Sequence, residues 1–448
     1  KYVGMIDMSA PVAKEKIAPY DGTSIDGIRV IFKKNRIKEA FEYCKFVQKQ
    51  GYFLSVNFVG TDAYTDKEFI DGIELFNSIH PDAVAIVDSF GLIKRKQFLR
   101  LVYLADNNLE SEIALAYHAH NNLQQAFGNA EALVEMNLKR DLIIDACVFG
   151  MGRGAGNLNL ELFADYMNEN YDKHYLIEPM LEIMDEYLND IYKNKFWGYS
   201  LPLYLSASTG CHPNYAIYLA EKDSLTVKAF NELLHSIPDE DKPKFSKDNA
   251  EKYYREFQES YVDDKSTIGV LSSKFDSKNI VILAPGRSIN DCKADILAEI
   301  SKDDTLSIAL NFCAEEYKPD YIFSSNMRRF AKIQNRTKAK CIITSNMKEA
   351  TNKDYVVNYA SYSMKNPDII DNSGLMLIKL LISCGVKAVK IAGMDGYSTY
   401  YGNNYMNSNL EYDFSKQAKK RNELISCEFK TLSTLISIEF ITPTQYEF

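Results

Sequence analysis

The chain has 448 residues, 46% of them hydrophobic, so it is long enough to form two or three separate cores. Its formal net charge of -9, with acidic and basic residues mixed along the whole length, argues against nucleic acid or an acidic membrane surface as a partner and favours a small-molecule substrate. The eight cysteines stand singly and no apolar run reaches about 18 residues, so we expect a cytoplasmic protein without a membrane span.

Short β-type runs alternate with helix-type segments from residue 2 to about residue 160, and these runs start 25 to 31 residues apart. The stretches between them, such as 36–50 and 122–136, carry apolar residues at helical spacing. Strands this apolar need helices on both faces, so the repeat predicts a parallel α/β sheet. The runs are YVGMID (2–7), GIRVIF (27–32), YFLSVNFV (52–59), AVAIVD (83–88), EIALAYH (112–118) and LIIDACVF (142–149).

Eight βα units close a (β/α)8-type TIM barrel, and this sequence shows six. Two further units amount to about 50 to 60 residues. The chain starts at Lys1 rather than methionine, almost directly in an apolar run. We therefore expect a TIM barrel whose first two βα units are missing from this sequence. An open doubly wound sheet is the alternative, because it explains six strands without a missing segment.

The rest of the chain predicts a helical extension and then a second α/β domain. Residues 161–235 are predicted to be mostly helical, and the polar segment 236–278 is predicted to hold one helix near 248–260 followed by a linker. The apolar run NIVILAPGRSI (279–289) then opens a region with strands expected near 280–284, 306–311, 320–324, 340–344, 355–358, 388–392 and 437–441. We expect an aldolase-type barrel at 1–165, a helical extension with linker at 166–270, and a Rossmann-like domain at 276–448.

The stretch YHAHNN (117–122) carries the first candidate site. Side chains alternate along a strand, so His118 and His120 project to the same face, at the carboxyl end of the fifth run. Two imidazoles can chelate a divalent metal when a third ligand completes the set, and Asn157 in the glycine-rich loop GMGRGAGN is the best candidate. Taken alone, an HxH pattern is more often structural than metal-binding.

Two more polar residues, Asp88 and Ser89, end the preceding strand run. An aspartate in this position caps the following helix in many proteins, and a glycine-rich loop is more often a turn than a ligand cradle. The coincidence of polar residues on consecutive strand ends is what favours a functional site.

Residues 116–161 contain HxHN, a downstream GNA and a GxGxxxGN loop in that order. This segment resembles the metal-binding segment of the metallo-aldolase and lyase superfamily that includes 4-hydroxy-2-oxovalerate aldolase, 3-hydroxy-3-methylglutaryl-CoA lyase and isopropylmalate synthase. The likeness extends over about 1–235. Its loop FWGYSLPLYLSASTGCHPNYA (196–216) resembles the helical extension of aldolase-like proteins associated with surface-polysaccharide synthesis.

The resemblance implies a barrel that holds Mn²⁺ or Mg²⁺ through His118 and His120, with Asn157 as a further ligand. The metal would act on a pyruvate-type 2-oxo acid and an aldehyde, and Arg29, Asp88 and Ser89 would line the catalytic mouth. One departure is plain: the family's opening D-x-T-L-R-D-G pattern, which supplies an aspartate ligand and an arginine, does not occur here. We expect it on the missing units, so the chain as given should bind metal weakly, and an inactive chain is one alternative.

In the second domain, APGRS (284–288) lies between a predicted strand and helix, where backbone N–H groups can bind phosphate. Alone this motif is more often a structural turn. Together with 311–330 and 372–398, it resembles a Rossmann-like group related to family-42 sialyltransferases. The resemblance implies a site for CMP or another nucleotide sugar, lined by Gly286, Ser288, Asn311, Asn326, Ser373, Gly374 and Asp395.

The group's presumed histidine base has no counterpart, because residues 236–448 contain no histidine. Tyr397, Tyr400 and Asp395 are substitutes in principle, but nucleotide binding is a firmer expectation than glycosyl transfer. The leading hypothesis is a metal-dependent aldolase or lyase fused to a nucleotide-sugar-binding domain. The alternatives are a CMP-sugar-dependent glycosyltransferase with a degenerate barrel, and a non-catalytic binding protein. The oligomeric state is open, with a homo-oligomer as one option.

Overall fold

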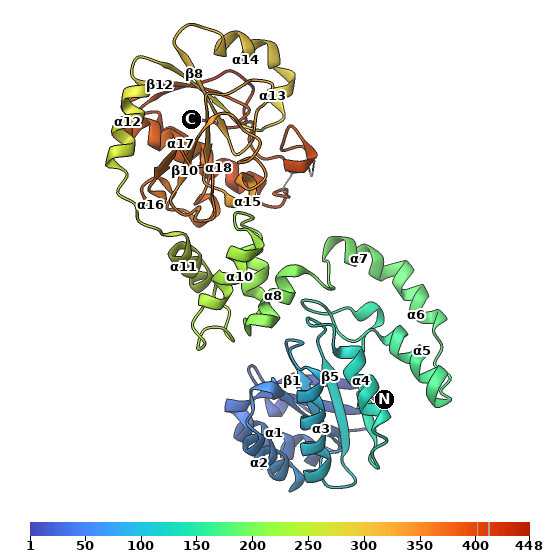
Figure 1. Ribbon diagram of the computed structural model, residues 1–448. Coiled ribbons are helices and arrows are strands. Elements are labelled where there is room, and N and C mark those ends of the chain that lie inside the picture. Colours follow the sequence, from blue (N-terminus) through green and yellow to red (C-terminus); the bar gives the residue numbers. More distant parts are fainter. Residues whose placement is uncertain (401, 411–412) are drawn as a thin grey trace. The chain divides into compact units, whose positions relative to one another are not determined.

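The computed structural model describes residues 1–400, 402–410 and 413–448. The chain divides into two units, each with its own parallel sheet (Figure 1). The first unit comprises 1–217 and 238–245, and the second comprises 218–237 and 246–448. Within the described residues, no helix is both long enough and apolar enough to cross a bilayer.

The first unit has a six-stranded sheet in which every strand is parallel to, and paired with, the next strand in the chain. A doubly wound sheet reverses its strand order at a switch point. The sequential order is instead that of a βα barrel, so the predicted TIM-barrel-type fold is confirmed and the doubly wound alternative is wrong for this unit. The strands are β1 (Val3–Asp7), β2 (Gly27–Lys33), β3 (Phe53–Val59), β4 (Ala83–Asp88), β5 (Ala114–Ala119) and β6 (Leu142–Ile144).

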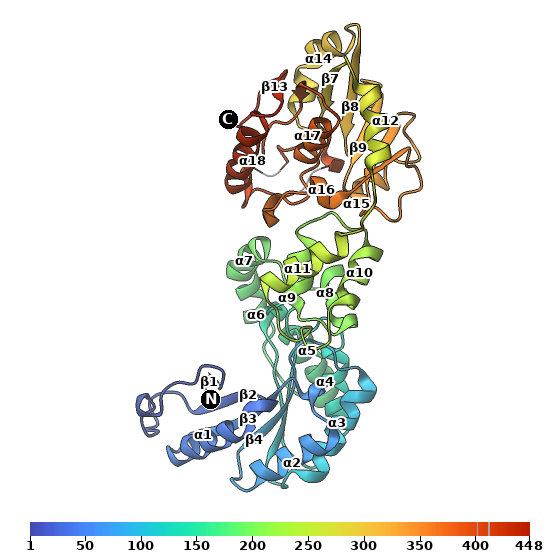
Figure 2. The same ribbon diagram turned by 90° about the vertical axis from the view of Figure 1, so that its left-hand side faces the viewer.

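One face of this sheet packs against helices. Alternate residues such as Leu54, Val56 and Phe58 enter one large core together with the apolar sides of the helices. Figure 2 shows α1 and α2 lying along strands β2 to β4. A capping box between Thr65 and Glu68 fixes the start of α2. The helices are α1 (Ile37–Lys49), α2 (Asp66–Asn77), α3 (Arg95–Asn108) and α4 (Ala126–Glu135).

The opposite face of the sheet carries smaller and more polar side chains. Ala85, Val87 and Ala116 form a small cluster there, and Ser55 and Asn57 are buried on the same face. Alternate residues of β5, such as Leu115 and Tyr117, therefore pack against the helices. The residues between them, including His118, project from the opposite face of the sheet.

The segment that follows the sheet is helical, as predicted. It comprises α5 (Leu160–Tyr171), α6 (Glu178–Ile183), a π-helical turn (Met184–Leu188), α7 (Asn189–Asn194), α8 (Leu201–Thr209), α9 (Pro213–Ala220) and α10 (Val227–Ser236). The helix expected near 248–260 is α11 (Lys247–Gln258). A further helix, α12 (Lys265–Phe275), occupies the segment expected to be a linker. Its residues Leu271 and Phe275 are buried in the core of the second unit, which stabilises a helix of weak apolar pattern.

The second unit has a seven-stranded parallel sheet in the order β11-β10-β9-β8-β7-β12-β13. All seven strands were predicted, to within one or two residues at each end. Chain order runs outward from β7 on one side and resumes with β12 on the other, so the switch point lies between β7 and β12. The strands are β7 (Asn279–Leu283), β8 (Thr305–Leu310), β9 (Tyr321–Ser324), β10 (Lys340–Thr344), β11 (Tyr355–Val357), β12 (Ala388–Ala392) and β13 (Ser437–Phe440).

Helices cover both faces of the second sheet. Ile280 and Ile282 of β7 pack into a core with α12, α17 (Ser373–Ser383) and α18 (Ala418–Leu432). Val281 and Leu283 face the other way and pack with α13 (Ser288–Asp291), α14 (Lys293–Ile300) and α15 (Met327–Phe330). This arrangement is the doubly wound fold that the sequence predicted for the C-terminal domain.

Candidate functional site

His118 and His120 lie at the carboxyl end of β5, with ring centroids 5.5 Å apart and planes at 86°. The backbone of His120 forms an isolated antiparallel bridge with Asn157, so the glycine-rich loop returns to the histidine pair. This return requires glycine at position 156. Gly156 has φ +82°, and a Cβ there would lie 2.1 Å from the carbonyl oxygen of Gly150.

Each imidazole is held through its Nδ1 atom. His118 Nδ1 lies 3.1 Å from an Asp145 carboxylate oxygen, and His120 Nδ1 lies 3.3 Å from the Gly156 carbonyl oxygen. Metal-binding histidines in proteins are held in this way, by a carboxylate or a carbonyl on the nitrogen that does not bind the metal. The arrangement therefore leaves Nε2 as the ligand atom on both rings.

Asn157 is the predicted oxygen ligand, and its backbone bridges that of His120. Its side-chain amide donates to the Met151 carbonyl at 2.8 Å, while its Oδ1 atom is buried and has no hydrogen-bond partner. A buried acceptor without a partner is unfavourable, and a cation would satisfy it. Burial, together with the nearby His118 and Arg153, lowers the pKa of His120 to about 4, so this ring is neutral at pH 7, as a metal ligand must be.

Arg29 and Asp145 form a bidentate ion pair on the same face of the sheet, with N–O distances of 2.6 and 2.8 Å. Burial on its own raises the pKa of the Asp145 carboxyl, but the hydrogen bond from His118 and the pair with Arg29 outweigh it and hold the pKa below its usual range. Arg29 was predicted from the sequence to line the mouth, whereas Asp145 was not. An aspartate inside the apolar run LIIDACVF was the signal that could have found it.

Asp88 and Ser89 are not brought to the histidine pair. In the parallel register His118 lies opposite Val87, so His118 and Val87 project from the same face of the sheet. Asp88 is the next residue and therefore projects from the other face, toward the helices. The Asp88 carboxylate accepts from the backbone N–H groups of Leu92 and Ile93 at 2.8 and 2.9 Å, and burial raises its pKa to about 7. Ser89 Oγ accepts from the Gly60 N–H. Both side chains hold loops at the rim.

The residues present fit a divalent cation in part. The two imidazoles are neighbours and the backbone of Asn157 bridges that of His120, whereas Asp145 is engaged by Arg29. Across the described ranges 1–400, 402–410 and 413–448, no cluster of three or more His, Cys, Asp and Glu side chains is arranged to hold a metal. The asparagine is therefore essential to the candidate site as it stands.

A cavity opens at the switch point of the second sheet, where the loops after β7 and β12 meet. Gly286 N–H donates to the Gly393 carbonyl at 2.8 Å. A Cβ at Gly286 would lie 2.2 Å from that carbonyl oxygen, so the contact needs glycine. Ligands of open α/β sheets bind at this point of the fold. Of the predicted nucleotide-binding residues, the cavity brings together Gly286, Asn311, Asn326, Ser373, Gly374 and Asp395; Ser288 does not line it.

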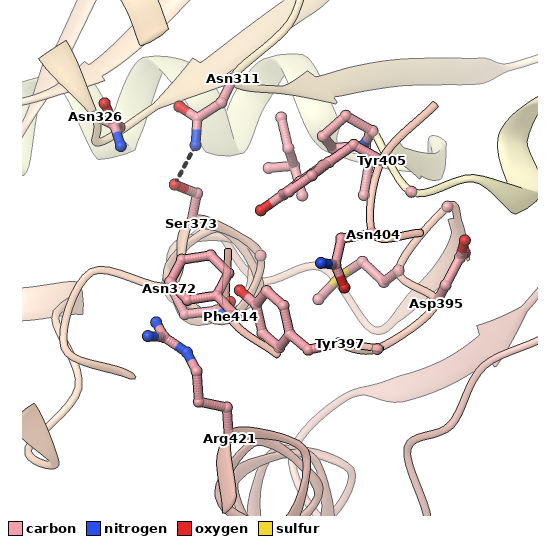
Figure 3. Close-up of a pocket in the computed structure, with 18 of the residues that line it drawn as sticks. Asn311, Asn326, Asn372, Ser373, Asp395, Tyr397, Asn404, Tyr405, Phe414 and Arg421 are labelled. Atoms are coloured by element: carbon pink, nitrogen blue, oxygen red, sulfur yellow. Dashed lines mark hydrogen bonds between the residues drawn. The ribbon is translucent and has the colours of Figure 1, made fainter. Parts of the chain in front are cut away.

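Asn311 and Ser373 are joined by a hydrogen bond on one wall of this cavity (Figure 3). Asn311 has φ +57°, a conformation that asparagine adopts more readily than most residues. Its amide nitrogen donates to Ser373 Oγ at 2.6 Å, and its oxygen accepts from Ser324 Oγ at 2.5 Å. Ser373 begins α17, whose cap is Asn372. These hydrogen bonds fix the side chain of Asn311, which follows β8, and that of Ser373 at the start of α17.

Asp395 holds the APGRS loop in place. Its carboxylate accepts from both the backbone N–H and the hydroxyl of Ser288. Burial raises the pKa of Asp395, which the two Ser288 hydrogen bonds only partly oppose. The opposite wall of the cavity is formed by Tyr397, Asn404, Tyr405, Phe414 and Arg421 (Figure 3). Only Tyr397 was named from the sequence, because the other four residues lie beyond the last predicted motif, where no local pattern marks them.

Residues 7–183 match the family model described as HMGL-like. A 4-hydroxy-2-oxovalerate aldolase of Pseudoalteromonas translucida is 29% identical over 27% of this chain and 33% of its own. That of Thermomicrobium roseum is 37% identical over 21% of this chain and 25% of its own. The carboxyl transferase domain of Rhizobium etli pyruvate carboxylase aligns with a TM-score of 0.40 at 12% identity, over 55% of this chain and 46% of that chain.

The N-terminal part of the chain is thus an HMGL-like aldolase/lyase domain, as its resemblance implied. The chain spans about a quarter to a third of the length of the curated relatives named here. The matched residues 7–183 all lie in the first unit, so the likeness drawn for the C-terminal domain stays a prediction.

Proposed function

We propose that the first unit is a metal-dependent aldolase or lyase that acts on a pyruvate-type 2-oxo acid. The observation that carries this proposal is the neighbouring pair of His118 and His120 at the carboxyl end of β5, bridged at its backbone by Asn157, whose side-chain oxygen is buried and has no hydrogen-bond partner. Carboxyl ends of barrel strands are where TIM-barrel enzymes place their chemistry.

His118, His120 and Asn157 would hold Mn²⁺ or Mg²⁺. When bound, such an ion stabilises the negative charge that develops on a 2-oxo acid as a carbon–carbon bond breaks or forms. The pair Arg29–Asp145 fixes the ring of His118, and the Gly156 carbonyl fixes that of His120. Both rings are thereby oriented before a ligand arrives.

The test is pyruvate release by the full chain from 4-hydroxy-2-oxovalerate in the presence of Mn²⁺. Cleavage of this substrate gives pyruvate and acetaldehyde, and lactate dehydrogenase with NADH reports the pyruvate. We expect turnover by the wild type and its loss in His118→Ala and His120→Ala. The control is Glu39→Gln, which removes an exposed ion pair with Arg36 on the same unit. The absence of pyruvate above the metal-only background contradicts the proposal.

We further propose that the second unit binds a nucleotide sugar, and that the two activities serve the synthesis of surface-polysaccharide sugars in the cytoplasm. The cavity at the switch point supports nucleotide binding, because six residues predicted for that role line it. The eight cysteines stand singly along the sequence, which is in keeping with a reducing compartment. Calorimetric titration of the full chain with CMP tests the binding, and saturable heat that Gly286→Ala abolishes is the expected result.

A further inference from the structure

Arg421 stands out in the second unit because its charge has no counter-ion among the residues that the structure describes. It lies on α18 and lines the switch-point cavity. Within 1–400, 402–410 and 413–448, no carboxylate is within ion-pairing distance of its guanidinium, and its Nε atom is buried without a hydrogen-bond partner. Asp368, whose pKa the charge of Arg421 helps to lower, is itself paired with Lys420. An uncompensated, partly buried cation is unfavourable unless something binds it.

Two aromatic rings hold the guanidinium in place. Its central carbon lies 4.3 Å from the ring centroid of Phe414 and 5.3 Å from that of Tyr397. Stacking of this kind covers the flat faces of a guanidinium and leaves the N–H groups at its edge for hydrogen bonds. Figure 3 shows the Arg421 side chain directed from its helix into the cavity, toward Asn372 and Phe414.

In the described part of the chain, two other cationic side chains line the switch-point cavity, and both are engaged: Arg329 donates to the Leu410 carbonyl, and Lys222 is ion-paired. Lys222 forms an ion pair of 2.8 Å with Glu251, both side chains being about nine-tenths buried, and it also donates to the Pro367 carbonyl. Arg421, Lys222 and Asp371 line a second, adjoining cavity as well as the first. Among the described residues, Arg421 is therefore a cation without a carboxylate partner that lines both cavities.

We propose that Arg421 binds an anionic group, a carboxylate or a phosphate, of the ligand that occupies these cavities. The proposal rests on the nucleotide-binding function proposed for this unit and names the chemistry that the ligand carries. A planar, fixed guanidinium matches the two oxygens of either group. The ligand anion sits between the switch-point cavity and the second cavity, whose further cations are Lys247 and Lys420.

The test compares the full-length wild type with Arg421→Gln by titration with cytidine, CMP and CMP–sialic acid. Arg336→Gln is the matched control, because Arg336 is an exposed arginine of the same unit that pairs with Glu315. We expect Arg421→Gln to weaken CMP roughly 10- to 100-fold while cytidine binding changes less than about twofold. If CMP is unaffected and only CMP–sialic acid is weakened, the bound group is the sugar carboxylate.

Thermal unfolding separates a binding role from a structural one. Removal of an unpaired charge should leave the Tm of Arg421→Gln equal to or above that of the wild type, and Arg421→Lys should bind CMP with intermediate affinity. If Arg421→Gln binds cytidine, CMP and CMP–sialic acid as tightly as the wild type does, the inference is overturned, while the proposal of nucleotide binding stands. If the wild type binds none of them, the proposal of nucleotide binding fails, and the inference is then tested with inorganic phosphate and acetate. An increase in Tm on adding these anions that is seen in the wild type but not in Arg421→Gln supports the inference. Equal increases in both proteins overturn it.

Discussion

The ion pair between Arg29 and Asp145 is predicted to stabilise the first unit and to orient His118 of the proposed metal site. Asp145→Asn removes the negative charge, leaves the guanidinium of Arg29 without a counter-ion, and weakens the hydrogen bond that holds His118. The pair joins β2 to the segment directly after β6, which are distant strands in the sheet order. Its loss should therefore affect the whole unit.

The magnitude follows from burial. Breaking a fully buried pair costs about 3–5 kcal/mol, and an exposed pair contributes about 0.2–1 kcal/mol. The side chains of Arg29 and Asp145 are 24% and 17% exposed, which places the pair between these limits. Asparagine retains one acceptor oxygen, so we expect Asp145→Asn to lower the free energy of unfolding by about 2–3 kcal/mol. It should also weaken metal binding about 10- to 100-fold, because His118 loses its orienting carboxylate.

The chain's single tryptophan makes the assay specific for this unit. Trp197 is buried and donates its indole N–H to the Phe149 carbonyl at 2.8 Å, within the first unit. Urea unfolding followed by Trp197 fluorescence reports the midpoint of this unit, and an unchanged m-value shows that stability alone has changed. Glu39→Gln is the control, with an expected loss under about 0.5 kcal/mol. A loss for Asp145→Asn no greater than for this control refutes the reasoning.

Two further predictions concern the rest of the chain. Gly286→Ala places a Cβ 2.2 Å from a backbone oxygen, so it should destabilise the second unit by about 2–4 kcal/mol, seen by circular dichroism, and leave the Trp197 midpoint unchanged. Burial, with Arg153 and Lys33, lowers the pKa of His212 to about 4. Its contribution to stability is therefore complete above the unfolded pKa near 6.5 and is lost as the pH falls toward 4, by on the order of 1–2 kcal/mol. His212→Asn should flatten that part of the pH profile measured by urea unfolding, and an unchanged profile contradicts the assignment.

The sequence predicted the two sheets well because buried parallel strands are nearly continuous apolar runs. It also predicted the positions of His118, His120 and Asn157, since strand alternation and a glycine-rich loop are local patterns. Helix α12 was missed because Leu271 and Phe275 are buried by tertiary contacts that no local pattern shows.

Long-range partners explain the other differences. Asp145 is 116 residues from Arg29 in the sequence. Arg421 lies beyond every motif that marks the switch-point cavity. Asp88 was correctly predicted to lie at the end of a strand, but its side chain faces the helices. There its carboxylate accepts hydrogen bonds from the backbone N–H groups of Leu92 and Ile93. Side-chain direction at a strand end depends on register, and register is fixed only in the assembled sheet.

The central claim is that His118 and His120 hold a divalent metal together with Asn157. The most direct measurement is the manganese bound by the full chain after equilibrium dialysis, for the wild type, the variant with both histidines changed to alanine, and Asn157→Ala. The account predicts manganese bound to the wild type, none bound to the double variant, and a reduced amount bound to Asn157→Ala. Equal manganese in all three proteins contradicts it.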